Sequence, residues 1–304
     1  MKCAFIISPS YSGSTLLSML LAHHPRLVTL GEFLDSRERR RFDGEGDFCS
    51  CGAELNACTY LETLVRKLNA EEMEFSVDYP NTAFNSADGL TDRILRAHVR
   101  APWFENLRRV AIAVLPPVRH TVKDIVARNC RVISTLLAQE GAEVYLDSAK
   151  NNNRVLYFDR YAPDVDVKVI WLVRDGRGVT NSIMKHYEMA LEPAIEYWKT
   201  EQRIVAETTR YLRPEQLFTL KYEALCAEPG RWLAAICAFL GLDVALLPET
   251  FGDQPLHLTG NNMRLRGIAE IRVDEKWKSM LTTSDLEIFT RRGGDLNRRL
   301  GYPR

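Results

Sequence analysis

Long apolar runs are missing from this 304-residue chain. No stretch approaches the ~18 apolar residues of a membrane-spanning helix, and the first residues lack the pattern of a signal peptide. Lys2 is instead followed at once by a strand that is typical of a protein core. The sequence therefore predicts no membrane span and a cytoplasmic location.

An excess of charge of either sign is also missing. Lys plus Arg and Asp plus Glu number 40 each, which gives a formal net charge of zero. A dedicated nucleic-acid binder is usually basic, so the balance argues against a nucleic-acid partner. We interpret the basic run at residues 37–41 as a solvated face, although an acidic ligand could use it.

The chain shows no Pro/Gly/Ser-rich linker, no internal repeat and no low-complexity tract. A single domain over residues 1–304 is therefore predicted. Strand-like segments alternate with helical ones along much of the sequence. This alternation predicts an α/β fold, with a mainly parallel central sheet flanked by helices on both faces.

A strand, a loop of small residues and a helix open the chain, in the sequence FIISPSYSGSTLLSMLL at residues 5–21. The first backbone N–H groups of such a helix lie unpaired at the positive end of its dipole, where a phosphate-like anion can bind. Gly13 lets the backbone approach the anion, and Ser12, Ser14 and Thr15 add hydroxyl donors. The alternative is an ordinary turn between a strand and a helix.

The lysine of the nucleotide-binding P-loop, G-x-x-x-x-G-K-[ST], is missing from this loop. When the motif is aligned on Gly13, Ser14 takes the place of the lysine that would hold β- and γ-phosphates. A kinase or ATPase is therefore disfavoured. The loop is still consistent with a related pocket that binds a smaller or differently placed phosphate. A P-loop-like kinase acting on a small molecule stays as an alternative.

A second candidate for anion binding follows a strand in the middle of the chain, where residues 167–187 read VKVIWLVRDGRGVTNSIMKHY. The β-branched and aromatic run at residues 167–173 is typical of a buried central strand. Arg174 follows that strand, at the end where ligands of open α/β sheets bind, and Ser182 lies about two helical turns further on. A guanidinium and a hydroxyl suit a phosphate monoester. In the alternative, Arg174 only pairs with Asp175 within the loop.

Together these two segments resemble the sulfotransferases that use 3′-phosphoadenosine 5′-phosphosulfate (PAPS). In that family R-S-G-[ST]-T-L-L binds the 5′-phosphosulfate and R-D-x-R-x-x-x-x-S binds the 3′-phosphate. The corresponding segments here are SGSTLL at residues 12–17 and RDGRGVTNS at residues 174–182, and further similarities extend from about residue 4 to Tyr302. The resemblance implies a P-loop-like three-layer fold, PAPS as donor, no metal, and in-line transfer of a sulfuryl group to an acceptor hydroxyl or amine.

The resemblance also implies which residues bind the donor. They belong to the first loop, to the arginine–serine segment and to a basic loop near the C-terminus: Tyr11, Ser12, Gly13, Ser14, Thr15, Leu16, Arg174, Ser182, Arg264, Arg266 and Gly267. Relatives usually carry Arg or Lys at the position of Tyr11. Either another cation reaches the site, from Lys150, Arg177 or Lys185, or the chemistry is slower. A non-catalytic relative that binds adenosine bisphosphate is therefore a further alternative.

Two residues are predicted to act in catalysis. Glu32 stands where several branches of the family carry a glutamate that acts as the base; alternatively, it is exposed and pairs with Arg37 or Arg39. Lys150 follows a short strand, so it belongs to the ligand side of the sheet and could reach the sulfate or the acceptor. It could equally form a structural pair with Asp147.

The acceptor is predicted to bind beside a helical insertion at about residues 60–140. Its aromatic side chains, among them Tyr79, Phe84, Trp103 and Phe104, could line an apolar pocket or pack in the core. A small molecule, a carbohydrate, a lipid or a peptide would each be a suitable acceptor, and the sequence chooses neither among them nor among oligomeric states.

Seven cysteines, an odd number, fit a reducing compartment better than a disulfide framework. Three of them cluster as Cys49-x-Cys51-x6-Cys58. Zinc ligands, a disulfide and free thiols are all possible, but structural zinc normally takes four ligands and no fourth is evident nearby. We therefore predict no metal site. The other four cysteines lie in apolar segments and are predicted to be packing residues.

Overall fold

The structure is a computed structural model that describes residues 1–35, 48–97, 101–251, 256–268 and 270–303. Within these residues, five parallel strands form one sheet in the order β2-β3-β1-β4-β5. The strands are β1 (Lys2–Ile7), β2 (Leu27–Thr29), β3 (Val144–Asp147), β4 (Asp166–Val173) and β5 (Leu217–Lys221). The basic run at residues 37–41 lies outside the described residues.

The central strands β1 and β4 have both faces covered, as their unbroken apolar sequences predict. From Cys3 to Ile7 every side chain of β1 is at most 2% exposed. β1 pairs with β4 along its whole length, from Lys2 opposite Asp166 to Ile7 opposite Trp171. A parallel sheet needs such apolar strands because helices cover both of its faces. The predicted α/β fold with a mainly parallel sheet is confirmed.

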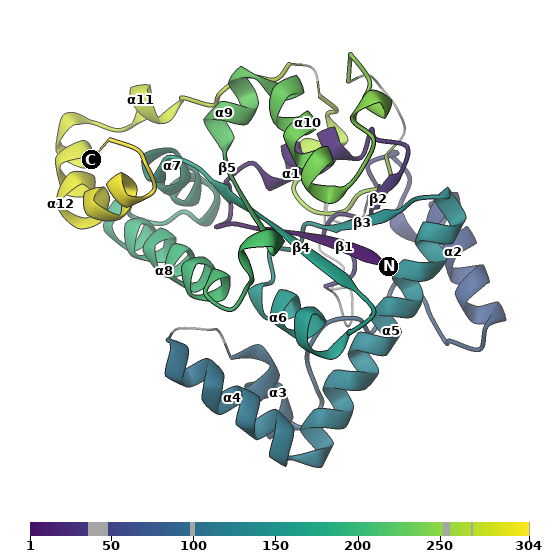
Figure 1. Ribbon diagram of the computed structural model, residues 1–304. Coiled ribbons are helices and arrows are strands. Elements are labelled where there is room, and N and C mark those ends of the chain that lie inside the picture. Colours follow the sequence, from purple (N-terminus) through teal and green to yellow (C-terminus); the bar gives the residue numbers. More distant parts are fainter. Residues whose placement is uncertain (36–47, 98–100, 252–255, 269, 304) are drawn as a thin grey trace.

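Helices form a layer on each side of this sheet (Figure 1). On one side Phe5 belongs to a core that includes residues of α5 and α6, and on the other Ile6 belongs to a core with residues of α1 and α10. The helices are α1 (Ser14–Leu21), α2 (Thr59–Ala70), α3 (Gly89–Arg96), α4 (Pro102–Val114), α5 (Pro116–Glu140), α6 (Asn152–Tyr161), α7 (Gly176–Tyr187), α8 (Leu191–Thr209), α9 (Tyr222–Ala227), α10 (Pro229–Leu240), α11 (Trp277–Met280) and α12 (Thr283–Arg299).

The segment between β2 and β3 is largely helical and contains α2 to α5. α5 begins at Pro116, at a helix start where a missing N–H costs nothing, and it ends at Gly141, whose φ of 61° suits a glycine. α3 and α4 project below the sheet in the view of Figure 1, beside the start of α5. The insertion thus adds a helical lobe on the α5–α6 side of the molecule.

The last helix, α12, packs against α7 and α8. Its buried Asn297 accepts a hydrogen bond from the backbone N–H of Gly176 at 2.8 Å. The Asn297 amide also donates to Asp175 at 3.3 Å and to the carbonyl of Pro303 at 2.7 Å. These bonds fix the turn that follows β4 from the far end of the chain.

A search of the described helices for one long and apolar enough to span a membrane finds none.

Candidate functional site

A cavity of about 730 Å³ lies beyond the carboxyl ends of β1 and β4, and we call it the donor cavity. The loop after β1 and the start of the helix that follows contribute Ser10, Tyr11 and residues 13–16 to its wall, whereas Ser12 is buried behind it. The segment after β4 contributes Arg174 and Ser182. Both segments in which the sequence predicts anion binding therefore face one cavity, and a single ligand can contact both.

The first of these segments has a backbone that only glycine fits well. Gly13 has a φ of 95° and directly precedes α1. A Cβ added to Gly13 would lie 2.4 Å from Cδ2 of Tyr222, so the aromatic ring closes the space beside the loop. The hydroxyl of Ser12 is buried and has no hydrogen-bond partner within the described part of the chain. The start of α1, whose first N–H groups have no partner within the helix, suits an anionic ligand.

Arg174 joins this loop to a segment near the C-terminus. Its guanidinium donates to the carbonyl of Tyr11 at 2.8 Å and to that of Asp274 at 2.9 Å. It also forms an ion pair with the Asp274 carboxylate at 3.3 Å and lies 4.7 Å from the centre of the Tyr222 ring. Asp175, the alternative partner, pairs with Arg177 instead at 2.5 Å. Arg174 is therefore held from several sides, with its position fixed before a ligand binds.

α7 brings two polar side chains to the donor cavity. The Ser182 hydroxyl donates to the carbonyl of Gly178 at 3.0 Å, a bond that a ligand phosphate can replace. His186, one helical turn later, also lines the cavity, and its ring stacks on Tyr11 with centroids 4.7 Å apart. The sequence analysis gives His186 no role. The four-residue spacing from Ser182, which puts both side chains on one helix face, is the signal that could have found it.

Glu32 and Lys150 meet on the wall of the donor cavity. The Lys150 ammonium donates to the Glu32 carboxylate, and the two form an ion pair. The alternative partners of Glu32, Arg37 and Arg39, lie outside the described residues.

Asp147, the alternative partner of Lys150, is engaged elsewhere. It forms a buried ion pair with Arg154 at 2.7 Å. Arg154 also donates to the carbonyl of Leu34 at 3.1 Å and to that of Thr82 at 3.0 Å. Lys150 is thus not needed to neutralise Asp147, and its charge points to the cavity.

A second cavity, of about 880 Å³, adjoins the first, and Ser10 and Lys150 line both. Much of its wall comes from the helical insertion. Of the four aromatic residues considered in the sequence analysis, Phe84 and Phe104 line it, whereas Tyr79 and Trp103 are 55% and 69% exposed. The ion pair of Glu32 and Lys150 therefore lies close to the junction of two cavities.

Two carboxyl groups on the wall of the second cavity have shifted pKa values. Burial raises the pKa of Asp35 to about 6, against the opposing effect of Arg154. The Asn151 amide donates to both Asp35 oxygens, at 2.9 and 3.1 Å. Burial also raises the pKa of Glu201, which accepts a hydrogen bond from the Ser10 backbone at 2.8 Å. This cavity therefore combines apolar side chains with carboxyl groups that protonate more readily than usual.

The basic loop near the C-terminus differs from expectation. Arg264 is buried, and it donates to the carbonyls of Gly260 and, at 2.7 Å, of Phe48. Arg266 and Gly267 are exposed, and the described wall of the donor cavity includes none of the three. The C-terminal residues found on that wall are instead Asn261, Met263, Glu270, Arg272, Val273, Asp274, Glu275 and Lys276. Asn261, Glu275 and Lys276 belong to segments that resemble the family, but no anion-binding motif marks residues 270–274.

Comparison with known proteins gives one family match. A family model described as the sulfotransferase family matches residues 4–245. The chain belongs to the sulfotransferase family. No curated protein sequence matches it.

The chain also aligns with solved structures of sulfotransferases. The sulfotransferase domain of the Synechococcus PCC 7002 olefin synthase is 22% identical, with a TM-score of 0.52, over 100% of this chain and 96% of that one. A sulfotransferase domain from the curacin biosynthetic pathway is 16% identical, with a TM-score of 0.49, over 98% and 97% of the two chains. Mouse sulfotransferase SULT7A1, complexed with PAP, is 12% identical, with a TM-score of 0.46, over 99% and 88%. The first match shows that the sulfotransferase fold includes residues 246–304, beyond the family model.

Proposed function

We propose that this sulfotransferase moves a sulfuryl group from PAPS to an acceptor hydroxyl or amine. One observation carries the proposal: the two anion-binding segments and the Glu32–Lys150 pair line the same cavity. In this assignment the loop at residues 10–16 binds the 5′-phosphosulfate, and Arg174 with Ser182 binds the 3′-phosphate. A cytoplasmic location for the activity stays our prediction from the sequence.

The charged side chains on the cavity wall suit an anionic donor, which can compete with acidic side chains for the cations there. Three cations of the wall have acidic partners: Lys150 pairs with Glu32, Arg174 with Asp274, and Arg272 with Glu270 at 3.6 Å. A 3′-phosphate can replace the Asp274 carboxylate at Arg174, because a guanidinium binds phosphate through two parallel hydrogen bonds. The wall is thus close to neutral before the donor binds and gains its anion-binding capacity as these pairs open.

The reaction itself needs a base and a set of charges in place. The acceptor oxygen or nitrogen attacks sulfur as the bond from sulfur to the leaving phosphate oxygen breaks, and adenosine 3′,5′-bisphosphate departs. We assign removal of the acceptor proton to Glu32. Lys150 and the N–H groups at the start of α1 stabilise charge on the sulfuryl oxygens, by analogy with phosphoryl transfer.

Tyr11 makes a second function worth testing. It brings no positive charge to a position where relatives usually have one, which favours a non-catalytic protein that binds adenosine 3′,5′-bisphosphate. Lys150 lies on the described wall of the cavity and is the replacement cation available to an enzyme, whereas Lys185 does not line that wall. Arg177 is less suited, because it pairs with Asp175 and lies over the Trp277 ring at 4.1 Å.

The acceptor belongs, in this proposal, to the second cavity. Phe84 and Phe104 offer apolar contacts, and Asp35 and Glu201 offer hydrogen bonds or charge. Lys150 lies between that cavity and the donor cavity. An acceptor with an apolar body and a hydroxyl or amine at one end fits this arrangement.

Calorimetry followed by a transfer assay tests the proposal. Adenosine 3′,5′-bisphosphate should bind without added metal and more tightly than Mg-ATP. Preference for Mg-ATP would instead support the kinase alternative. Transfer of radiolabelled sulfate from PAPS to any member of an acceptor panel then establishes an enzyme, whereas bisphosphate binding without transfer to a broad panel would favour the non-catalytic protein.

A further inference from the structure

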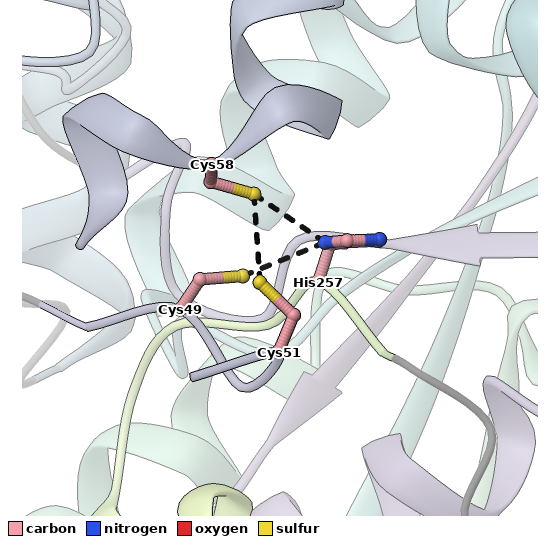
Figure 2. A group of neighbouring side chains, drawn as sticks. All are labelled: Cys49, Cys51, Cys58 and His257. Carbon is pink, nitrogen blue, oxygen red and sulfur yellow. Dashed lines mark hydrogen bonds between the residues drawn. The ribbon is translucent and has the colours of Figure 1, made fainter. Parts of the chain in front are cut away.

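Three cysteines and one histidine meet at a site outside the described wall of the donor cavity. Cys49, Cys51 and Cys58 come from the segment between β2 and α2, and His257 comes from the segment after α10. One possible ligand atom from each residue lies within 4.8 Å of all the others. Figure 2 shows the three sulfur atoms and Nδ1 of His257 pointing toward a common centre. The fourth ligand that the sequence analysis lacked is therefore present, about two hundred residues away in the chain.

The spacing of these atoms matches a tetrahedral zinc site. Zn–S bonds of about 2.3 Å and a Zn–N bond of about 2.0 Å require S–S edges of about 3.8 Å and S–N edges of about 3.5 Å. The Sγ atoms of Cys51 and Cys58 are 3.8 Å apart. Nδ1 of His257 is 3.6 Å from Sγ of Cys49 and 3.4 Å from Sγ of Cys58. The remaining distances are at most 4.8 Å, so these three edges already have the spacing that a bound ion requires.

The local backbone holds the cysteines in position. A tight turn follows Cys49. The N–H of Cys49 donates to the carbonyl of Ala53 at 2.8 Å, and Gly52 within the turn has a φ of 87°. Cys58 directly precedes α2, and the positive end of that helix stabilises a thiolate. Cys49 and Cys58 are buried while Cys51 is exposed, so an ion can enter from solvent.

The histidine is oriented by its neighbours. Its ring stacks on Tyr60 with centroids 4.3 Å apart and planes 6° from parallel. The residues on either side of it are bound by Ser50, whose hydroxyl donates to the carbonyl of Leu256 at 2.5 Å and accepts from the N–H of Leu258 at 2.7 Å. Nδ1 is thereby turned toward the sulfur atoms, and Nε2 points away from them (Figure 2).

We propose that Cys49, Cys51, Cys58 and His257 bind one Zn²⁺ in a structural site. Three thiolates and a neutral imidazole fill all four positions of a tetrahedral ion, so no position is left for a reacting water. The three thiols each release one proton when the ion binds. Zinc rather than a harder cation is the metal that this sulfur-rich set prefers.

The site joins two segments that support Glu32. Thr259, two residues after His257, donates its N–H to the carbonyl of Leu30 at 3.1 Å. Its carbonyl accepts the N–H of Glu32 at 3.3 Å. Metal binding therefore fastens the backbone that positions Glu32. The importance of this link for turnover rests on the proposed function, whereas metal binding itself does not.

The metal content of the purified full-length protein tests the proposal. Mass spectrometry of the elements should find about one zinc per chain. Cys51→Ser should lose most of that zinc, and Cys130→Ser, at a partly buried cysteine of α5, should keep it. His257→Asn should likewise lose zinc, while His120→Asn, at an exposed histidine of α5, should not.

A cobalt experiment keeps the test decisive if a variant fails to fold. Unchanged protein stripped of metal and given Co²⁺ should show the visible bands of a tetrahedral cobalt–thiolate centre. Addition of Zn²⁺ should remove these bands and raise the melting temperature. Cys51→Ser, where it folds, should show neither response.

Two results would overturn the proposal. One is unchanged protein that takes up neither Zn²⁺ nor Co²⁺ at this site while its thiols are reduced. The other is a non-reducing peptide map of freshly purified protein in which Cys51 is joined to Cys58 by a disulfide.

Discussion

The two adjoining cavities are built in different ways. The residues of the donor cavity to which we assign anion binding follow the ends of β1 and β4 or lie in the helices that come next. The second cavity takes Phe84, Leu95 and Phe104 from the helical insertion, and Glu201 from α8. Residues next to the sheet are fixed by its register, whereas an insertion can change without disturbing the sheet. This division suits an enzyme that keeps one donor while its acceptor site can vary.

The largest expected effect comes from the pair near the junction of the two cavities. Glu32→Gln should lower turnover about 100-fold or more, because the amide cannot take up the acceptor proton, while donor affinity is kept. Initial rates at saturating PAPS, with calorimetry of adenosine 3′,5′-bisphosphate, measure both quantities. Glu275→Gln is the matched control, since Glu275 lines the donor cavity but pairs with Lys278 at 2.6 Å. Near-normal turnover of Glu32→Gln would mean that another group is the base.

A change on the donor side alone should affect donor binding first. Arg174→Ala should weaken binding of adenosine 3′,5′-bisphosphate by about 1.5–3 kcal/mol, roughly 10- to 150-fold, because it removes charge-assisted hydrogen bonds. Calorimetry measures the loss, and circular dichroism checks the fold. Arg231→Ala, at an exposed arginine paired with Glu228 on the surface, should bind as tightly as the unchanged protein. Unchanged affinity of Arg174→Ala would contradict the 3′-phosphate assignment.

The donor loop should also tolerate no added side chain at Gly13. Gly13→Ala should lower the free energy of unfolding by about 2 kcal/mol, because the new methyl group meets Tyr222 and the φ is positive. Gly141→Ala shares a positive φ, but nothing lies within 4 Å of its added Cβ. Urea unfolding of both variants separates the clash from the backbone strain. Equal losses would show that Tyr222 moves aside.

An effect of similar size should come from the second cavity. The pKa of Asp35 is about 6 in the folded chain and about 4 when unfolded. Between these values the folded chain keeps a proton that the unfolded chain releases, so the free energy of unfolding falls as pH rises from about 4 to 6 and then stays lower. Asp35→Asn removes the ionisable carboxyl group, so this variant should lack that fall in the free energy of unfolding.

Thermal unfolding at pH 4 and pH 8 measures that change. Relative to the unchanged protein, Asp35→Asn should be about 2 kcal/mol more stable at pH 8 than at pH 4. Asp166→Asn, at an exposed carboxylate of β4, serves as the control. The same difference in both variants would mean that the burial of Asp35 is not its cause.

The sequence predicted what is encoded locally. Apolar runs identified β1 and β4, and the segments that follow them, which carry Gly13 and Arg174, line the donor cavity. The sulfotransferase family, inferred from these motifs, is confirmed by the family match. Which residues bind donor or acceptor stays a prediction.

The features that the sequence did not reveal depend on contacts between segments that are far apart in the chain. His257 lies beside the cysteines because Thr259 forms a β-bridge with Gly31, just after β2. No sequence motif predicts that bridge. The resemblance to the family implies that Arg264 binds the donor, but in the structure Arg264 is buried and donates to backbone carbonyls. Asp274 and Tyr222 contact Arg174 only after the chain has folded.

Asn297 has a practical consequence for anyone who shortens this gene. A clone that stops at residue 245, where the family match stops, encodes every strand and both anion-binding motifs, but it omits Asn297 and Asp274. The backbone N–H of Gly176 would lose its acceptor. The apolar side chains of α7 and α8 that pack against α12 would be exposed to water. Such a fragment should aggregate on expression, so the expressed chain should extend through residue 304.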